Sequence, residues 1–203
     1  MTRPQLADVG ADAILVMPTL AYYVSVLAEI VRPLDQFPQV IEDGTLADAL
    51  YDAALLVRLL NDIGTELLVM PASEQAALLD TLRLRLAEQP EAATLPNVLM
   101  AAGGQGTQFT RIHKDVLFGE FNVSLYGLED IFCGSKALQV FGDNLAYFSQ
   151  LYSQQRASLG EAVHLINERL ADERIGQLII RFVQFHEELY SQPFQTSAGE
   201  YAI

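Results

Sequence analysis

The spacing of apolar residues in the middle of the chain constrains its fold more than any other feature. They recur at intervals of three and four, at Leu46, Leu50, Ala53, Val57, Leu60, Gly64 and Leu67. This spacing places them along one face of an α-helix that packs against a core. Leu78, Leu82 and Leu86 repeat the pattern, and no segment shows the sustained alternation typical of strands. The sequence therefore predicts an all-α fold.

Proline, glycine and capping residues divide the chain into the helices that we expect. Pro18 is expected to kink the first long helix, Thr45 to cap the helix of the apolar face, and Ser73 to cap the next one. The later helices are expected at 109–126, 136–154, 160–171 and 173–190. The chain has no internal repeat or linker, so we expect residues 1–203 to form a single helical domain.

The charge balance excludes one class of partner. The 203 residues contain 26 acidic and 12 basic ones, for a net charge of −14, and the basic residues do not cluster. Such a chain repels a polyanion, so we expect no nucleic-acid partner. The single cysteine, Cys133, excludes an internal disulfide framework and is typical of a reducing cytoplasm. The first residues lack the pattern of a signal peptide, so we expect a soluble, cytoplasmic protein.

One uncharged segment tests the expectation of solubility. Residues 13–28 carry no charge, but they number fewer than the ~20 that a membrane span needs. They also include Pro18, Thr19 and Ser25. The pattern favours a buried core helix, and we expect no transmembrane segment.

The stretch from Arg58 to Glu66 carries the clearest candidate chemistry. On a continuous helix, Asn61 and Thr65 share an inward face, and Asp62 and Glu66 lie on the neighbouring one. Oxygen-bearing side chains at one level of a bundle suit a hard cation such as Mg²⁺. The same residues also fit an ordinary ion-pair ladder beside a hydrogen-bonded core asparagine, and the spacing alone leaves both interpretations open.

This stretch resembles the second metal-binding motif of the class I terpene synthases, Asn-Asp-x-x-Ser/Thr-x-x-x-Glu. Asn61, Asp62 and Thr65 match, whereas Val69 occupies the position of the final Glu. The resemblance implies an antiparallel helical bundle of the isoprenoid-synthase type. It also implies Mg²⁺ as cofactor and ionisation or cyclisation of a prenyl diphosphate as activity, with this chain as the enzyme or as a subunit of one.

A second segment extends the resemblance. Residues 114–122, Lys-Asp-Val-Leu-Phe-Gly-Glu-Phe-Asn, resemble the basic-acidic step and Gly-Glu-x-Asn that follow the motif in that family. The likeness implies an insertion at 70–108 and makes Asp115 the source of the missing carboxylate. The expected metal ligands are thus Asn61, Asp62, Thr65, Glu66 and Asp115. The expected substrate-binding residues are Arg58, Arg111, Lys114 and Tyr201.

The chain also departs from the family pattern. It contains no Asp-Asp pair, so the Asp-rich first metal motif is absent. Val16 and Glu200 stand where the family places arginines that contact the diphosphate, and such a group needs positive charge around it. The chain is therefore interpreted as part of a larger or split enzyme, or as a descendant with a lost or changed activity. No catalytic residue is assigned.

Two other functions stay open. The first is a non-catalytic helical protein that binds an isoprenoid, another apolar small molecule or a partner chain, as a homodimer or with a complementary subunit. The second is a helical metal-dependent oxidase or oxygenase-like protein with Glu and His ligands, for which His113, His186, Glu187 and Glu188 are the candidates.

Overall fold

All of the regular secondary structure in the described part of the molecule is helical. The computed structural model describes residues 1–31, 34–88, 95, 99, 108–128 and 134–192. The helices within these residues are α1 (Arg3–Ala13), α2 (Val16–Ile30), α3 (Phe37–Glu42), α4 (Thr45–Ile63), α5 (Thr65–Val69), α6 (Ala72–Glu88), α8 (Thr110–Phe118), the 3₁₀ helix η1 (Val123–Leu125), α9 (Gly134–Leu170) and α10 (Arg174–Ser191). The predicted all-α fold is confirmed.

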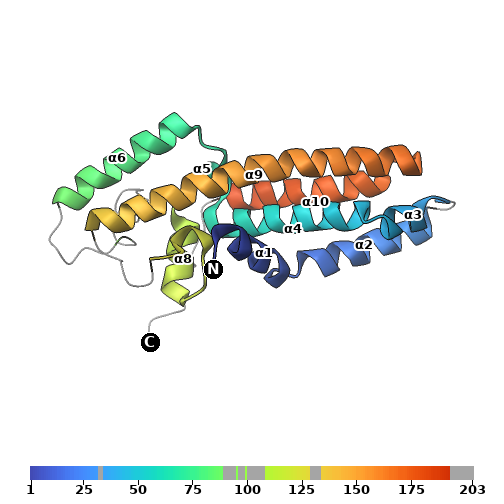
Figure 1. Cartoon of the computed structure of the whole chain (residues 1–203), viewed down its shortest axis with the longest axis horizontal. Coiled ribbons are helices and arrows are strands. Elements are labelled where there is room, and N and C mark those ends of the chain that lie inside the picture. The colour runs from blue at the N-terminus through green and yellow to red at the C-terminus, as the bar shows by residue number, and fades with distance from the viewer. Residues whose placement is uncertain (32–33, 89–94, 96–98, 100–107, 129–133, 193–203) are drawn as a thin grey trace.

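Helix α4 forms the centre of the bundle. It lies between α9 and α10 on one side and α1 and α2 on the other (Figure 1). Leu56, Leu59 and Leu60 are fully buried, although they point in different directions around the helix. A helix that is apolar all round must be enclosed on every side, so α4 is a core helix rather than one with a single buried face.

Helix α9 is a single helix of 37 residues and packs along α4. The prediction of two helices, 136–154 and 160–171, is wrong. No proline interrupts the segment, and Gly160 lies on an exposed face where a helix tolerates it at modest cost. Near the far end of α9, Arg169 pairs with Asp43 and donates to Thr45 at the start of α4.

The N-terminal segment bends earlier than predicted. Helices α1 and α2 meet at an angle of 50°, and the break falls at Ile14 and Leu15 rather than at Pro18. Leu15 has a left-handed backbone (φ 58°), and Pro18 lies in the first turn of α2, where its missing N–H is not needed. Among the described helices, none alone is long and apolar enough to cross a membrane. The bent α1–α2 pair meets that test only by length and composition.

Helix α2 is buried on one face only. Leu20 and Val24 are fully buried against α4, and α10 also contacts this helix. The opposite face exposes Tyr22 and Ile30, which are 66% and 74% accessible. The expected core helix is therefore a half-buried one with an apolar outer surface.

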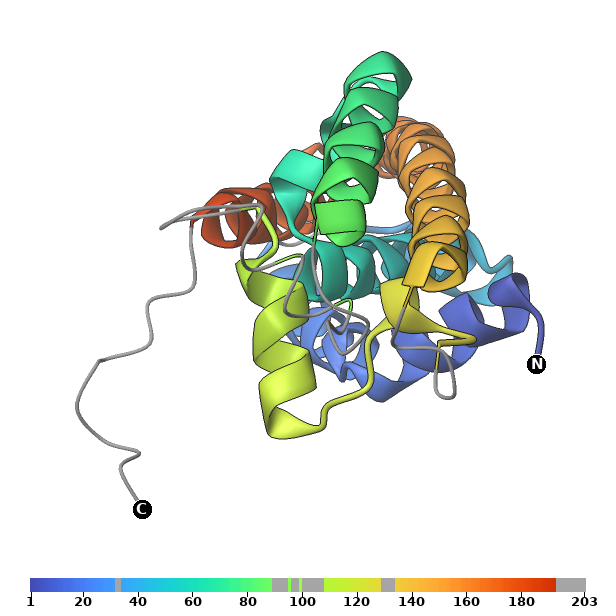
Figure 2. The same ribbon diagram turned by 90° about the vertical axis from the view of Figure 1, so that its left-hand side faces the viewer.

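Two glycines end helices that the sequence predicts to continue. The backbone of Gly64 (φ 90°, ψ 152°) separates α4 from α5, so the predicted continuous face from Leu46 to Leu67 is interrupted. Gly119 (φ 66°) ends α8, and the chain turns back toward α4 before η1. The predicted helix at 109–126 is therefore wrong. Figure 2 shows α8 and η1 beside the end of α4.

Part of the expected insertion at 70–108 is described. Helix α6 packs on the first half of α9 and buries Leu82 and Gln75. The Gln75 amide donates to the Leu67 carbonyl oxygen at 3.1 Å and to Ser149 Oγ at 2.9 Å, so it ties α6 to α5 and α9. Most of residues 89–107 lie outside the described part, and the insertion stays a prediction.

Candidate functional site

Asp62 lies at the centre of a buried polar cluster at the end of α4. It is fully buried, and its Oδ2 accepts a hydrogen bond from Arg58 Nη2 at 2.8 Å, one helical turn earlier. The same oxygen accepts the backbone N–H of Val123 at 2.9 Å, and Oδ1 accepts Asn61 Nδ2 at 3.2 Å. A carboxylate removed from water needs such donors to stay in the folded chain.

Asp115 brings a second buried carboxylate from α8. It is 1% accessible, and its Oδ1 lies 3.2 Å from Lys114 Nζ. Lys114 also pairs with Glu120 at 2.8 Å, and the Glu120 backbone N–H donates to the carbonyl oxygen of Asp115 at 2.7 Å. The turn that Gly119 permits therefore folds Glu120 back over the cation beside Asp115.

Asn122 joins the two carboxylate residues. Its Nδ2 donates to the backbone oxygen of Asp62 at 2.6 Å and to Asp115 Oδ2 at 2.7 Å. Its Oδ1 accepts the backbone N–H and the hydroxyl of Ser124, at 2.9 Å and 2.6 Å. One buried amide thus uses both ends and joins Asp115 to the backbone of Asp62, whereas a shared metal site with Asn61 stays a prediction.

The cluster continues to α9 and α1. Asn144, which is 1% accessible, donates to the carbonyl oxygens of Ser124 at 3.0 Å and Tyr126 at 2.8 Å. Its Oδ1 accepts Arg3 Nε at 2.8 Å. Four segments that are far apart in sequence therefore share one chain of hydrogen bonds.

The electrostatics of the cluster follow from burial. Burial raises the pKa of Asp62 to about 6, against the opposing effects of Arg58 and the Val123 N–H. Burial also raises the pKa of Asp115, although Asn122 and Lys114 act in the other direction. Arg58 pairs with Asp62, and Lys114 pairs with both Asp115 and Glu120, so a basic side chain of the chain itself faces each buried carboxylate.

Two shallow pockets lie beside the cluster, and Phe121 lines both. One, of about 330 Å³, is lined by Gly10, Arg58, Asn61 and Glu120 among others. The other, of about 220 Å³, is lined by Asp115, Asn122 and neighbouring residues. Gly10 leaves room for the Arg58 side chain in the first pocket, because a Cβ at this position would lie only 3.1 Å from that side chain.

The other residues of the expected metal site point elsewhere. Because α4 ends at Ile63, Asn61 and Thr65 are not on one helix, and that prediction is wrong. Thr65 Oγ1 donates to the Glu187 carbonyl oxygen in α10 at 2.6 Å, which holds α5 against that helix. Glu66 is exposed. The expected stripe of Arg58, Asp62 and Glu66 therefore survives only as the Arg58–Asp62 pair.

Three of the four expected substrate-binding residues lie in or beside the cluster. Arg58 and Lys114 border it, and the Arg111 guanidinium, which lies 4.4 Å from the ring centre of Tyr190, also interacts electrostatically with Asp115. Burial lowers the pKa of Arg111. The guanidinium nevertheless keeps its positive charge, as arginine does in proteins. Tyr201 lies outside the described residues.

The cluster as folded does not fit Mg²⁺. All four carboxylate oxygens of Asp62 and Asp115 accept hydrogen bonds from the chain, and Arg58 and Lys114 already supply positive charge. A hard cation needs open oxygens and repels such neighbours. Within the described residues, no three His, Cys, Asp or Glu side chains are grouped as metal ligands would be.

The candidate ligands of an oxidase have other contacts. His186 Nδ1 lies 2.7 Å from the Phe182 carbonyl oxygen, and its ring packs against Phe182 and Tyr190. Glu187 accepts the Tyr152 hydroxyl at 2.5 Å and pairs with Arg156 at 3.1 Å. The Glu187 contacts hold α10 against α9, whereas those of His186 lie within α10.

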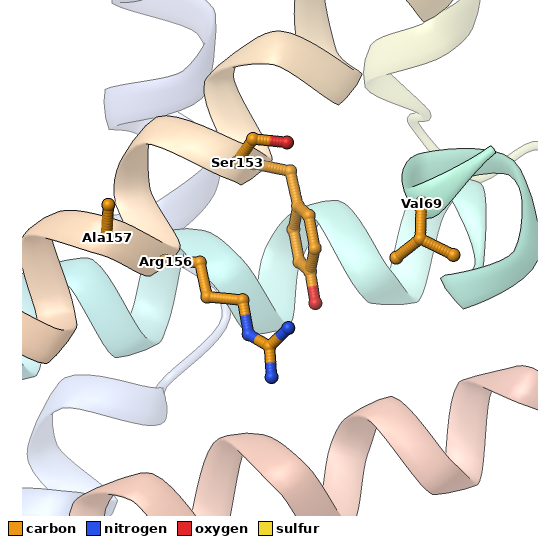
Figure 3. A pocket seen from close by; sticks show the side chains of 5 residues that line it. Val69, Ser153, Arg156 and Ala157 are labelled. Carbon is orange, nitrogen blue, oxygen red and sulfur yellow. The ribbon is translucent and has the colours of Figure 1, made fainter. Parts of the chain in front are cut away.

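Tyr152 and Arg156 line a third pocket, of about 550 Å³, with Val69, Ser153 and Ala157 (Figure 3). Burial and the Glu187 carboxylate raise the pKa of Tyr152, so its hydroxyl stays protonated and donates to Glu187. Sequence reasoning did not find this pocket, because Val69 and Arg156 are 87 residues apart and follow no motif.

The comparisons with known proteins add no relative. No protein-family model, curated protein or solved structure matches this chain.

Proposed function

We propose that this chain is a non-catalytic helical protein that works by binding a partner chain, and that the Asp62–Asp115 cluster is a structural latch. The observation that carries the proposal is the apolar outer face of α2, where Tyr22 and Ile30 are mostly exposed. Large contiguous apolar surfaces on a folded protein mark sites of contact with another molecule.

The polar cluster supports the same proposal. Its carboxylates are buried and bonded to donors from α4, α8 and the segment before η1. Groups that hold three segments together with all their oxygens used are well suited to fix a structure. They are poorly suited to exchange ligands during a reaction.

A second candidate function is the Mg²⁺-assisted ionisation of a prenyl diphosphate in an isoprenoid-synthase-type bundle. One observation favours it: Asn122 joins Asp115 to the backbone of Asp62, more than fifty residues earlier, and the family resemblance expects a carboxylate from Asp115. Metal binding there would require the Asn122 and Lys114 contacts to open first.

A photo-crosslinking experiment tests the partner-binding proposal. Benzoylphenylalanine replaces Val26 on the outer face of α2, and separately replaces Leu84 on α6 as a control that is 68% exposed. We expect covalent adducts with a protein, identified by mass spectrometry, from position 26 and none from position 84. The absence of any adduct at position 26 would contradict the proposal.

Calorimetry separates the two candidate functions. The purified protein is titrated with MgCl₂ in the presence and absence of inorganic diphosphate. It is also incubated with geranyl, farnesyl and geranylgeranyl diphosphates. We expect neither Mg²⁺-dependent diphosphate binding nor turnover. Binding that disappears in both Asp62→Asn and Asp115→Asn would replace the partner-binding proposal with the enzymatic one.

A further inference from the structure

The exposed side of α2 carries six residues that we call the α2 stripe: Leu15, Thr19, Tyr22, Tyr23, Val26 and Ile30. The five large apolar members are between 41% and 74% accessible. At 3.6 residues per turn, all six fall within an arc of about 100°. They form one continuous surface on the side of α2 that faces away from α4.

Two hydroxyl groups in and beside the stripe are already hydrogen-bonded. The Thr19 hydroxyl donates to the Leu15 carbonyl oxygen and the Ser25 hydroxyl to that of Ala21, each at 2.8 Å. Neither hydroxyl therefore needs water when the surface is covered. Leu15, at the head of the stripe, combines 68% exposure with a left-handed backbone, a costly conformation for a leucine in a solvent-facing position.

The spacing of the stripe is symmetric. Read forward, its first three residues follow one another at intervals of four and three, and its last three at intervals of three and four. The centre falls between Tyr22 and Tyr23, whose rings contact edge to face at 5.8 Å. In an antiparallel pair about a two-fold axis through this centre, each residue of the stripe lies level with another residue of the stripe, as in an isologous interface.

The size of the stripe suits a stable interface. Its exposed side chains present on the order of 600 Å² of mostly apolar surface, by the areas typical of such residues. Two copies that cover this surface would together bury about 1,200 Å², which is at the lower end of the range for specific interfaces.

Charge argues for a protein occupant over a membrane. The chain carries −14, and no Lys or Arg lies between Arg3 and Arg32. Helices that lie on membranes carry basic residues on their polar face, to attract anionic lipid. An uncharged stripe is also the part of this acidic surface where two identical copies meet with least repulsion.

We propose that two copies of this chain pair through the α2 stripe, with the two α2 helices antiparallel about an axis between Tyr22 and Tyr23. This inference rests on the proposed function and names its partner. In such a pair Thr19 of one copy lies opposite Val26 of the other, and Leu15 lies opposite Ile30.

Sedimentation equilibrium tests the dimer. We expect the purified chain to be a dimer at micromolar concentration. Tyr22→Glu places a charge at the centre of the stripe and weakens association at least 100-fold, since a central anchor dominates an interface. Leu84→Glu, an equally exposed change on α6, leaves the dimer intact, and circular dichroism verifies that both variants keep their helix content.

Disulfide trapping tests the antiparallel arrangement. Two variants, Thr19→Cys and Val26→Cys, are made in a chain whose Cys133 is replaced by Ser. Each variant is oxidised separately, and a mixture of the two is oxidised as well. In the proposed pair, identical positions are offset by about 10 Å along the helices, too far for a disulfide, whereas Thr19 and Val26 are level. We expect a covalent dimer only in the mixture. A disulfide within each single variant would indicate parallel helices and overturn the proposal.

Each remaining outcome is also decisive. A monomeric wild-type chain overturns the second copy as partner, and its binding to phosphatidylcholine vesicles would assign the stripe to a membrane instead. A monomer whose photo-crosslinks at position 26 reach a different protein overturns this inference but leaves the proposed function standing. Turnover of a prenyl diphosphate contradicts the non-catalytic function and leaves the dimer measurement as it is.

Discussion

The side chain of Asn122 makes four hydrogen bonds inside the protein, and each end of the amide is used. Its neighbours Asp62 and Asp115 belong to different helices, so the amide is the point where α4 and α8 are joined. Removing one partner of such a buried hydrogen bond costs more stability than replacing both partners by apolar groups, because the remaining partner stays buried without a hydrogen bond.

Changing that amide to an acid tests the latch. Asn122→Asp turns the donor toward Asp115 and the Asp62 carbonyl into an acceptor, so three oxygens face one another. We expect the free energy of unfolding to fall by about 3 kcal/mol or more. Urea denaturation measures it. Glu120→Gln, on the exposed side of the same cluster, should change stability by less than about 0.5 kcal/mol. Equal effects would contradict the latch.

Asp62 also predicts a dependence on pH. Its pKa is raised to about 6 in the folded protein from an ordinary value of 3.8. The folded state therefore binds the proton more tightly than the unfolded state. The contribution of Asp62 protonation to the free energy of unfolding is fully present below pH 3.8 and is lost as the pH rises through 6.

The size of this contribution is roughly 2–3 kcal/mol. The unfolding free energy of the wild type, relative to Asp62→Asn, should fall by that amount between pH 4 and pH 7. Chemical denaturation at half-unit pH steps measures the difference. A difference that stays flat, or that rises with pH, would mean that Arg58 and the Val123 N–H outweigh burial.

At the scale of elements, the two breaks at Gly64 and Gly119 decide where the candidate residues lie. The first turns Thr65 toward α10, and the second brings Asn122 back to α4. Gly64 adopts a backbone region that side chains with a Cβ rarely enter, and a Cβ there would lie 3.5 Å from the Tyr190 carbonyl oxygen.

A pair of glycine substitutions tests this role. Gly64→Ala should lower the unfolding free energy by about 1–3 kcal/mol, because the break would become strained. Gly160→Ala should raise it by about 0.5–1 kcal/mol, because Gly160 is within α9 and its Cβ would face open space. Thermal or urea unfolding of both variants provides the comparison, and a stabilising Gly64→Ala would mean that the break is relaxed.

The sequence predicts the helices better than their ends. The apolar spacing along α4 and the low strand content were sufficient for the all-α fold and the core face. Gly64 fits the helical spacing, and its positive-φ backbone is set by the packing of α5 against α9 and α10, which no local pattern reveals. The residues of the polar cluster were harder to predict from the sequence than the ends of the helices. Asp62 and Asp115 were named from a family resemblance, but Asn144 and Arg3 follow no local pattern, since their partners lie 18 to 141 residues away.

At the scale of the whole molecule, burial is uneven. Helix α4 is enclosed by the bundle, whereas α6 projects beyond it beside the first half of α9 (Figure 1). Within α6, only Gln75 and Leu82 are buried. Local opening is easiest where few apolar contacts must be broken.

Hydrogen exchange followed by mass spectrometry tests this difference. We expect peptides from α6 to exchange faster than those from α4, by two or more orders of magnitude in rate. Replacing Gln75 by Ala removes the bonds to Leu67 and Ser149 and should accelerate exchange in α6 while leaving α4 nearly unchanged. Equal protection of the two helices would show that α6 unfolds only with the core.

The uninterrupted course of α9 has a consequence for how the molecule engages its surroundings. Thirty-seven residues in one α-helix span about 55 Å, so α9 fixes the length of the bundle. It sets a constant separation between the α6 end and the end where Arg169 meets Asp43. Whatever the protein holds at those two ends is kept about 55 Å apart, and a dimer through α2 would carry one such helix on each of its two outer sides.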